Sequence, residues 1–254
     1  AQWNNLILAP LVGAGTFVLG MLFAKPFQTL AGLETAAERR TFSLTIGLYN
    51  YGFIPIPLAM LLFSKETVGV LFVHNLGVEF ALWTLGVMVI SGARVSGGLK
   101  QLINAPLVAM VLALTLNFSG AAGHLPRPVV TALHILGQCA IPLSLILAGA
   151  VIDDHLEELH STMSWRVITV SALLRLVLLP VCFLVLAKYL PASAELKRVI
   201  VLQAAMPSAV FPIVMSKHYN GDPPTALRVV VGTSVISLLT IPFWIRFGLS
   251  WMGL

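Results

Sequence analysis

Two short segments of this chain place prolines and polar side chains inside runs that are otherwise apolar. The first extends from Asn50 to Pro57 and the second from Pro207 to Pro212, and each contains two prolines. Proline removes a backbone donor and clashes with the preceding turn, so a helix that reaches either segment must open there. The half-helix that follows an opening presents the positive end of its dipole, which suits an anion. An ordinary proline kink is the structural alternative.

The predicted binding residues lie in or beside these two segments. Asn50 lies at the edge of the first, where its amide can hold a substrate carboxylate or satisfy a freed backbone carbonyl, and both uses are left open. Gln203 and Ser208 hold comparable positions at the second. Tyr51 is included for its position, although its ring is expected to pack rather than to contact a ligand. The full predicted set is Asn50, Tyr51, Gly52, Pro55, Pro57, Gln203, Pro207, Ser208 and Pro212.

Three further polar residues inside apolar runs are candidates for coupling or gating. Asn75 and Glu79 are spaced i, i+4 and share a helix face. A carboxylate at the centre of a membrane helix costs about 2.5–3.5 kcal/mol, so Glu79 is expected to face a bundle interior. Its hypothesised role is proton coupling or substrate gating, and a structural hydrogen-bonded carboxyl is the alternative. Arg175 is a candidate counter-ion to Glu79 or to an anionic substrate, with snorkelling to a membrane interface as the alternative.

The sequence predicts neither a metal site nor an enzyme active site. The stretch from Asp153 to Glu158 is acidic, but His155 and His160 are five residues apart, a spacing that does not bring two histidines together on a helix. A solvated loop helix is expected there. No nucleophile elbow, phosphate loop or paired intramembrane aspartates occur in the sequence. No cofactor is predicted, and proton or sodium coupling is left open.

The elements that must position these residues are predicted to be membrane-spanning helices. The 254 residues are 58% hydrophobic and 10% charged, with a mean hydropathy of +0.94, which leaves too little polar surface for a water-soluble globule. The net charge of +5 suits anionic lipid and requires no nucleic-acid partner. Eight spans are predicted from apolar runs of about 20 residues. They are residues 4–24, 41–63, 68–92, 102–119, 128–152, 163–188, 197–216 and 226–249.

Two of the predicted spans form an internal repeat. Glu38 precedes Pro55 by seventeen positions (55 − 38), and Glu195 precedes Pro212 by seventeen (212 − 195). Four spans separate the two segments, so with alternating topology they cross the membrane in opposite senses, as in an inverted repeat. The prediction divides the chain into a first repeat, residues 1–92, and a second, residues 102–254. Two helices of the first repeat then have no counterpart, and the absence of Met at residue 1 favours a natural protein with two more helices in front.

At these residues the chain resembles the auxin efflux carrier family, the PIN-like membrane transport proteins of plants and bacteria. The resemblance covers nearly the whole chain and rests on Asn50 to Leu58, on Leu136 to Leu143 with Gly149 and Ala150, and on Ala205 through Ser208 and Pro212 to Tyr219. It implies an all-α polytopic membrane protein, related to the bile-acid symporters, with ten helices in an inverted repeat and a substrate site formed by two crossover helices. Eight of the ten would be visible here. Residues 1–92 with 163–254 would form a moving transport domain, and residues 102–152 a scaffold part that dimerises.

The same resemblance implies a function. The family transports small organic anions, auxin in plants and malate- or malonate-like carboxylates in bacterial relatives, by elevator-type alternating access. The position of Asn50 matches a substrate-contact position of the family, and the short loop Ala93 to Gln101 is similar to bacterial members. The implied setting is a bacterial plasma membrane, with the bilayer, an organic anion and a second copy of the chain as partners. A sodium-coupled bile-acid-like symporter and an anion-sensing membrane domain are the alternatives.

Overall fold

A computed structural model describes residues 2–92, 105–153 and 164–254, and these are nearly all helical, with no strand among them. Four helical segments within the described residues are long and apolar enough to cross a membrane, namely Ile7–Phe27, Lys65–Ser91, Trp165–Tyr189 and Pro223–Met252. They coincide with four of the predicted spans. The full count of eight remains a prediction.

The segments 41–63 and 197–216, each predicted as one interrupted span, are each divided into two short helices. Helix α2 (Ala36–Gly47) is followed by non-helical residues 48–54 and then α3 (Pro55–Leu62). Helix α12 (Ala194–Ala204) is followed by residues 205–210 and then α13 (Phe211–His218). We call residues 48–54 the first break and residues 205–210 the second break. The prolines explain where α3 and α13 begin, because proline is tolerated at the first turn of a helix and not in its interior.

The helices before the two breaks begin with similar caps. Thr35 accepts a hydrogen bond from Glu38 N at 3.1 Å, and Glu38 Oε2 accepts from Thr35 N at 2.7 Å, which is a capping box. Burial of the Glu38 carboxyl raises its pKa. The hydrogen bonds from backbone N–H donors lower it by more, so the pKa of Glu38 lies below its ordinary value. Ser193 caps α12 through Leu196 N at 3.2 Å. The register noted in the sequence at Glu38 and Glu195 is thus set by local helix starts.

Two of the long helical segments contain a π-helical turn in their middle. Helix α4 (Lys65–Ala81) continues through η2 (Leu82–Gly86) into α5 (Val87–Ser91), and α10 (Trp165–Leu173) continues through η4 (Leu174–Leu178) into α11 (Leu179–Tyr189). Such turns widen the helix locally and are frequent at functional sites. Both lie beside the residues of the candidate site.

Helix α1 (Gln2–Ala24), which leads into the 3₁₀ turn η1 (Lys25–Phe27), packs against α4 at glycines. A Cβ added to Gly77 would overlap the carbonyl oxygen of Pro10, and one added to Gly13 would overlap that of His74. Helix backbones that approach this closely are typical of membrane bundles, where small residues permit tight packing. The same contact fixes the height of Asn75 and Glu79 relative to α1.

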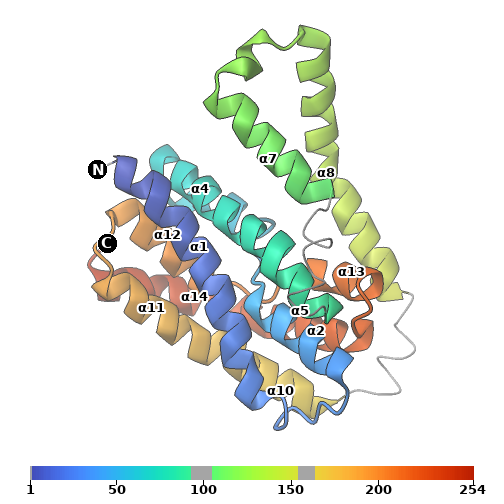
Figure 1. Cartoon of the computed structure of the whole chain (residues 1–254). Coiled ribbons are helices and arrows are strands. Elements are labelled where there is room, and N and C mark those ends of the chain that lie inside the picture. Colours follow the sequence, from blue (N-terminus) through green and yellow to red (C-terminus); the bar gives the residue numbers. More distant parts are fainter. Residues whose placement is uncertain (1, 93–104, 154–163) are drawn as a thin grey trace.

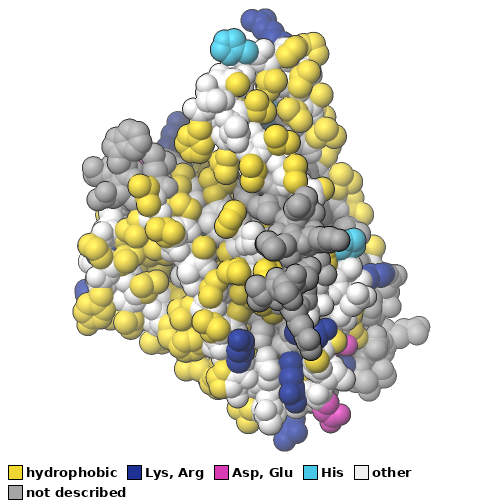
Figure 2. Space-filling view, in the orientation of Figure 1, with side chains coloured by type: hydrophobic (Ala, Val, Ile, Leu, Met, Phe, Trp, Pro, Cys, Tyr) yellow, Lys and Arg dark blue, Asp and Glu magenta, His cyan; other side chains and the backbone are white. Residues whose placement is uncertain are grey.

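The last helix, α14 (Pro223–Met252), is capped by Asp222, which accepts from Thr225 N at 2.8 Å ahead of Pro223. Helices α7 (Ala105–Phe118) and α8 (Arg127–Asp153), joined through η3 (Ala121–His124), form a hairpin that projects from the remaining helices (Figure 1). Apolar side chains cover much of the surface in view, over this hairpin as well as over the main bundle (Figure 2). A large exposed apolar surface is expected of helices solvated by lipid.

Candidate functional site

The two breaks lie side by side and hydrogen-bond to each other. Ala209 N donates to Leu48 O at 2.8 Å, and Asn50 N donates to Pro207 O at 2.8 Å, so that Tyr49 and Ser208 form an isolated antiparallel bridge. These bonds satisfy backbone groups that helix opening would otherwise leave unpaired. The structure therefore brings together the two segments that the sequence singles out.

The Asn50 side chain satisfies backbone within its own break. Its Oδ1 accepts from Ile54 N at 3.3 Å, and the residue is only 6% exposed. The predicted backbone role is thus present, with an N–H donor rather than a freed carbonyl as the partner. Among the described residues its Nδ2 group has no recorded acceptor, which leaves two N–H donors beside the break.

Tyr51 connects the first break to two other elements. Its carbonyl oxygen accepts from Asn75 Nδ2 at 2.8 Å and from Gln203 Nε2 at 3.3 Å, and Gln203 Nε2 also donates to Asn75 Oδ1 at 3.1 Å. The sequence analysis expected the Tyr51 ring to pack and made no prediction for its hydroxyl, which donates to Glu79 Oε1 at 2.6 Å. Five predicted residues, Asn50, Tyr51, Asn75, Glu79 and Gln203, therefore surround the first break.

Glu79 is held by a second donor that the sequence analysis did not select. The indole Nε1 of Trp83 donates to Glu79 Oε2 at 2.9 Å. The i, i+4 spacing of Glu79 and Trp83 was a signal for this contact, because residues four apart share a helix face. Trp83 also packs edge-on against Phe211 at the start of α13, with ring centroids 5.5 Å apart.

Arg175 does not form the ion pair with Glu79 that the sequence suggested. Its side chain is completely buried, which also rules out snorkelling. Nε donates to Met206 O at 2.9 Å and Nη2 to Gln203 O at 3.1 Å. The guanidinium carbon lies 4.9 Å from the ring centre of Tyr49 and 5.5 Å from that of Phe183. The positive charge therefore caps the carbonyl end of α12 and stacks on aromatic rings instead of meeting a carboxylate.

Several polar groups near the second break have no recorded partner within the described residues. They are Ser208 Oγ, Gln203 Oε1 and Arg175 Nη1, all on residues that are at most 1% exposed. Ser208 N donates to Thr233 Oγ1 of α14 at 3.3 Å. Burying a polar group without a hydrogen-bond partner is costly. The three groups therefore make the region of the second break a candidate binding site for a polar ligand.

The prolines restrict which backbone donors the half-helices can offer. Pro55 and Pro57 occupy the first and third positions of α3, and Pro212 the second position of α13, so none of them carries an N–H. The N–H groups of Gly52, Phe53, Val210 and Phe211 have no recorded acceptor among the described residues. The N–H groups that remain for an anion therefore lie at the ends of the two breaks and at Phe211, the first residue of α13.

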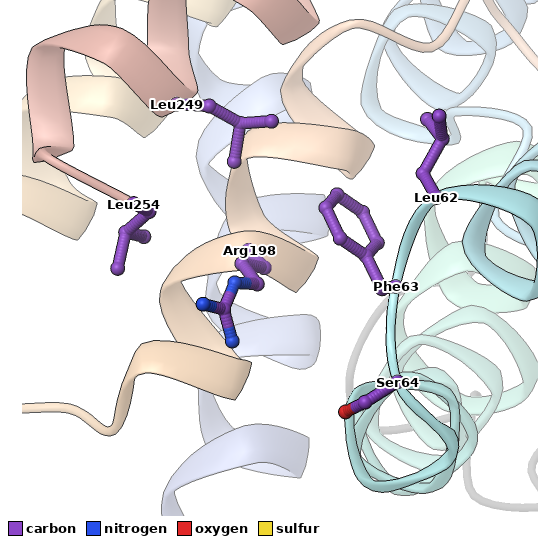
Figure 3. A pocket seen from close by; sticks show the side chains of 6 residues that line it. All are labelled: Leu62, Phe63, Ser64, Arg198, Leu249 and Leu254. Atoms are coloured by element: carbon purple, nitrogen blue, oxygen red, sulfur yellow. The ribbon is translucent and has the colours of Figure 1, made fainter.

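Two cavities lie in the described part of the chain near these helices, and one of them is lined by Trp83, the second donor to Glu79. A cavity of about 380 Å³ lies between the α3–α4 corner, α12 and the C-terminus, and is lined by Leu62, Phe63, Ser64, Arg198, Leu249 and Leu254 (Figure 3). None of the predicted site residues lines it. A second cavity, of about 310 Å³, is lined by Trp83, Ala105, Phe211, Val214, Met215, His218 and Tyr219. Trp83, which lines this cavity, donates to Glu79, and Glu79 accepts from Tyr51 of the first break. His155 and His160 lie outside the described residues.

Comparisons with known proteins point to one class. A family profile described as "Membrane transport protein" matches residues 93–245. An uncharacterized transporter of Methanocaldococcus jannaschii is 26% identical over 204 residues, which are 78% of this chain and 64% of that protein. An uncharacterized transporter of Methanothermobacter thermautotrophicus is 26% identical over 247 residues, 95% of this chain and 78% of that protein. The chain thus spans about two thirds to three quarters of the length of these relatives. No solved structure matches it.

Proposed function

Because the chain belongs to the membrane transport protein family, which includes the auxin efflux carriers, we propose that it is a secondary transporter of small organic anions working by elevator-type alternating access. The observation that carries the proposal is the pairing of the first and second breaks through Asn50 N and Ala209 N. Opened backbone at membrane depth is tolerated only where it is buried in protein or lines a cavity. In secondary transporters such points are where substrates bind.

The two breaks are proposed to be the crossovers of an inverted repeat. The two helix–break–helix units are similar in size, with helices of 12 and 8 residues in the first and 11 and 8 in the second. In the proposed arrangement, residues 1–92 with 163–254 move as the transport domain. Residues 102–152 belong to the scaffold, through which two copies associate in the membrane.

An anion is favoured over a cation by the groups that remain available. The Asn50 Nδ2 group, the Ser208 hydroxyl and the N–H groups of Gly52 and Val210 are donors, and the Arg175 charge lies directly behind the second break. A sodium site needs several oxygen ligands. Tyr51 O and Asn75 Oδ1 already accept amide protons. Among the described residues, Gln203 Oε1 and Ser208 Oγ are the buried oxygens near the breaks without a recorded partner, and two oxygens are too few for such a site.

Counterflow in proteoliposomes tests the proposal. Vesicles loaded with unlabelled malate, malonate or indole-3-acetate should accumulate the same labelled anion without added sodium. Asn50→Asp should abolish the exchange, because it places a carboxylate where an anion binds and removes two donors. Asn117→Asp, the same change at an exposed residue of α7, serves as the matched control and should leave exchange intact.

Three other outcomes contradict the proposal in different ways. Saturable binding of a labelled anion without exchange would support an anion-sensing domain. Exchange that requires sodium would support the symporter. Exchange that Asn50→Asp leaves unchanged would move the binding site away from the breaks.

A further inference from the structure

The hydrogen bonds of Glu79 to its neighbours differ between its ionised and protonated states, and one of these neighbours is Tyr51 of the first break. We propose that Glu79 is the proton-binding site of this transporter, and that its protonation turns the Tyr51 hydroxyl into a donor for the transported anion. The inference rests on the proposed anion transport and adds the coupling ion and the residue that conveys its effect. It predicts that one proton binds together with each anion.

The geometry is that of one carboxylate between two neutral donors. Tyr51 Oη donates to Glu79 Oε1 at 2.6 Å, and Trp83 Nε1 donates to Glu79 Oε2 at 2.9 Å. Within the described part of the chain, no cation contacts either oxygen. An ionised carboxylate accepts at both oxygens, so both contacts are satisfied when Glu79 is charged.

A protonated Glu79 cannot keep both bonds as they stand. Its hydroxyl oxygen becomes a donor and needs an acceptor. The Trp83 indole is a donor only, so it holds the oxygen beside it as an acceptor. The Tyr51 hydroxyl can donate or accept, and it can rotate. The proton therefore settles on Oε1, and the bond reverses so that Glu79 Oε1–H donates to Tyr51 Oη.

This reversal releases the proton of the Tyr51 hydroxyl to another acceptor. Tyr51 belongs to the first break, beside Asn50 and the Gly52 N–H, where the anion is proposed to bind. An anionic carboxylate is a strong acceptor for such a hydroxyl. Neutralising Glu79 also removes the repulsion between its charge and the anion. Both effects make proton binding and anion binding favour each other, and this coupling is reciprocal.

The surroundings of Glu79 contain few other groups that could impose the same pH dependence. Helices α1 and α3, which pack against α4, carry no ionisable side chain. The charged residues of α12, Glu195, Lys197 and Arg198, lie in its first half, and Glu195 interacts with Glu66 at the opposite end of α4 from Glu79. His74, on α4 itself, is fully buried and contacts Asn75 Oδ1 at 3.4 Å.

Two further groups lie on the other side of Trp83. His218 and Tyr219 of α13 line the same cavity as Trp83. Tyr49 and Arg175 lie behind the breaks, in contact with each other rather than with Glu79. Histidine is the side chain that ordinarily titrates near neutral pH, so His218 is the competing origin for a pH effect and must be tested beside Glu79.

The apparent KM for labelled malate in counterflow, with equal pH on both sides, tests the inference between pH 5 and 8. If one proton binds with each anion, KM should rise by up to about tenfold per pH unit as the pH increases. In Glu79→Gln, KM should keep only the pH dependence that the titration of malate itself imposes. Glu66→Gln, at an exposed acid on the same helix, and His218→Gln should both keep the wild-type slope. Because the titration of malate affects KM in all variants alike, the comparison of the wild type with Glu79→Gln isolates the contribution of Glu79.

Tyr51→Phe and Trp83→Phe distinguish the relay from a purely structural role of Glu79. Tyr51→Phe keeps the ring and removes the hydroxyl, so it should raise KM at low pH and flatten the slope. Trp83→Phe keeps the ring that packs on Phe211, but lets the proton reside on either oxygen, so it should reduce the slope by about half. Thermal unfolding of each variant reports stability separately from these slopes.

The failures are distinguishable. If wild-type vesicles exchange none of the anions, the proposed function fails. If exchange occurs and Glu79→Gln keeps the wild-type slope, transport stands and the proton site is wrong. If Glu79→Gln abolishes exchange, proton uptake on addition of malate to weakly buffered Tyr51→Phe decides: about one proton per anion in that variant would overturn the relay, and none would support it.

Discussion

The first and second breaks share a layout but are held by different chemistry. Around the first, the carbonyl of Tyr51 receives two neutral amides, from Asn75 and Gln203, and its hydroxyl meets a carboxylate. Around the second, the buried guanidinium of Arg175 holds the carbonyls of Gln203 and Met206. One break is linked to a group that can gain or lose a proton, whereas the other is fixed by a group that stays charged.

This difference indicates that the first and second breaks have different roles in the candidate site. A permanent charge at the carbonyl end of α12 complements the negative end of that helix and does not respond to pH. The amides and the phenol at the first break can exchange donors and acceptors at small cost. The second break therefore behaves as the fixed side of the site and the first as the adjustable side.

Replacing Arg175 should have the largest effect, because it removes the buried charge that holds the end of α12 at the second break. Arg175→Ala leaves the buried carbonyl of Met206 without its donor, leaves Gln203 O with backbone donors alone, and opens a void beside Tyr49 and Phe183. It should destabilise the protein by about 3–5 kcal/mol. Denaturant unfolding in detergent measures the loss. The stability of Arg175→Lys should lie between those of the wild type and Arg175→Ala, because an ammonium keeps the charge but lacks the forked geometry of the guanidinium.

Arg246→Ala is the matched control for Arg175, because Arg246 is exposed on α14. That variant should change stability by no more than about 0.5 kcal/mol. If Arg175→Ala is as stable as Arg246→Ala, the second break is not held by the guanidinium, and the contrast between the two breaks disappears.

Gly77 and Gly232 offer a comparison of helix packing behind each break. Alanine at Gly77 would press on the backbone of Pro10, which cannot move without shifting α1 against α4. Alanine at Gly232 would lie 2.8 Å from Cγ2 of Ile168, a side chain that can rotate. Gly77→Ala should therefore cost about 1–3 kcal/mol and displace Asn75 and Glu79, while Gly232→Ala should cost less. Thermal unfolding measures the loss of stability in each variant, and the malate KM reports the displacement of Asn75 and Glu79. Equal losses of stability in Gly77→Ala and Gly232→Ala would contradict this difference in packing.

The positions of the breaks could be predicted from sequence because their causes are local. A proline lacks a backbone N–H wherever the chain folds, so α3 had to begin near Pro55 and α13 near Pro212. The helix starts at Thr35 and Ser193 were marked by the acids that follow them. The same prolines also remove donors from the first turns of α3 and α13, and the prediction of an anion site at these half-helices did not take this into account.

The partners of the buried polar groups could not be predicted in the same way. Arg175 bonds backbone carbonyls about thirty residues away, and every residue has a carbonyl, so the sequence carries no mark of the contact. A charged residue suggested an opposite charge, and the structure supplied helix-end carbonyls and aromatic rings instead. The π-helical turns that hold Trp83 and Arg175 likewise have no composition of their own. Tertiary packing decides these contacts.

The smallest expected effects concern the amides at the first break, where Asn75 and Gln203 share one acceptor. Asn75→Leu or Gln203→Leu alone leaves Tyr51 O with one donor and removes the bond between the two amides, so each should cost about 1–2 kcal/mol. The double variant leaves the buried carbonyl without a donor, which adds about 1–3 kcal/mol. The sum of the single variants counts the roughly 1 kcal/mol of the bond between the amides twice, so the double variant should lose about 0–2 kcal/mol more than that sum.

Thr233→Val extends this cycle to the second break. It removes the acceptor of Ser208 N, a bond of 3.3 Å that shares no partner with Asn75. Thr233→Val combined with Asn75→Leu should be additive within about 0.5 kcal/mol, because residues without shared partners rarely couple. Coupling in this pair as strong as that between Asn75 and Gln203 would mean that the two breaks respond as one unit. The adjustable side could then no longer be separated from the fixed side, and protonation of Glu79 would be expected to loosen both.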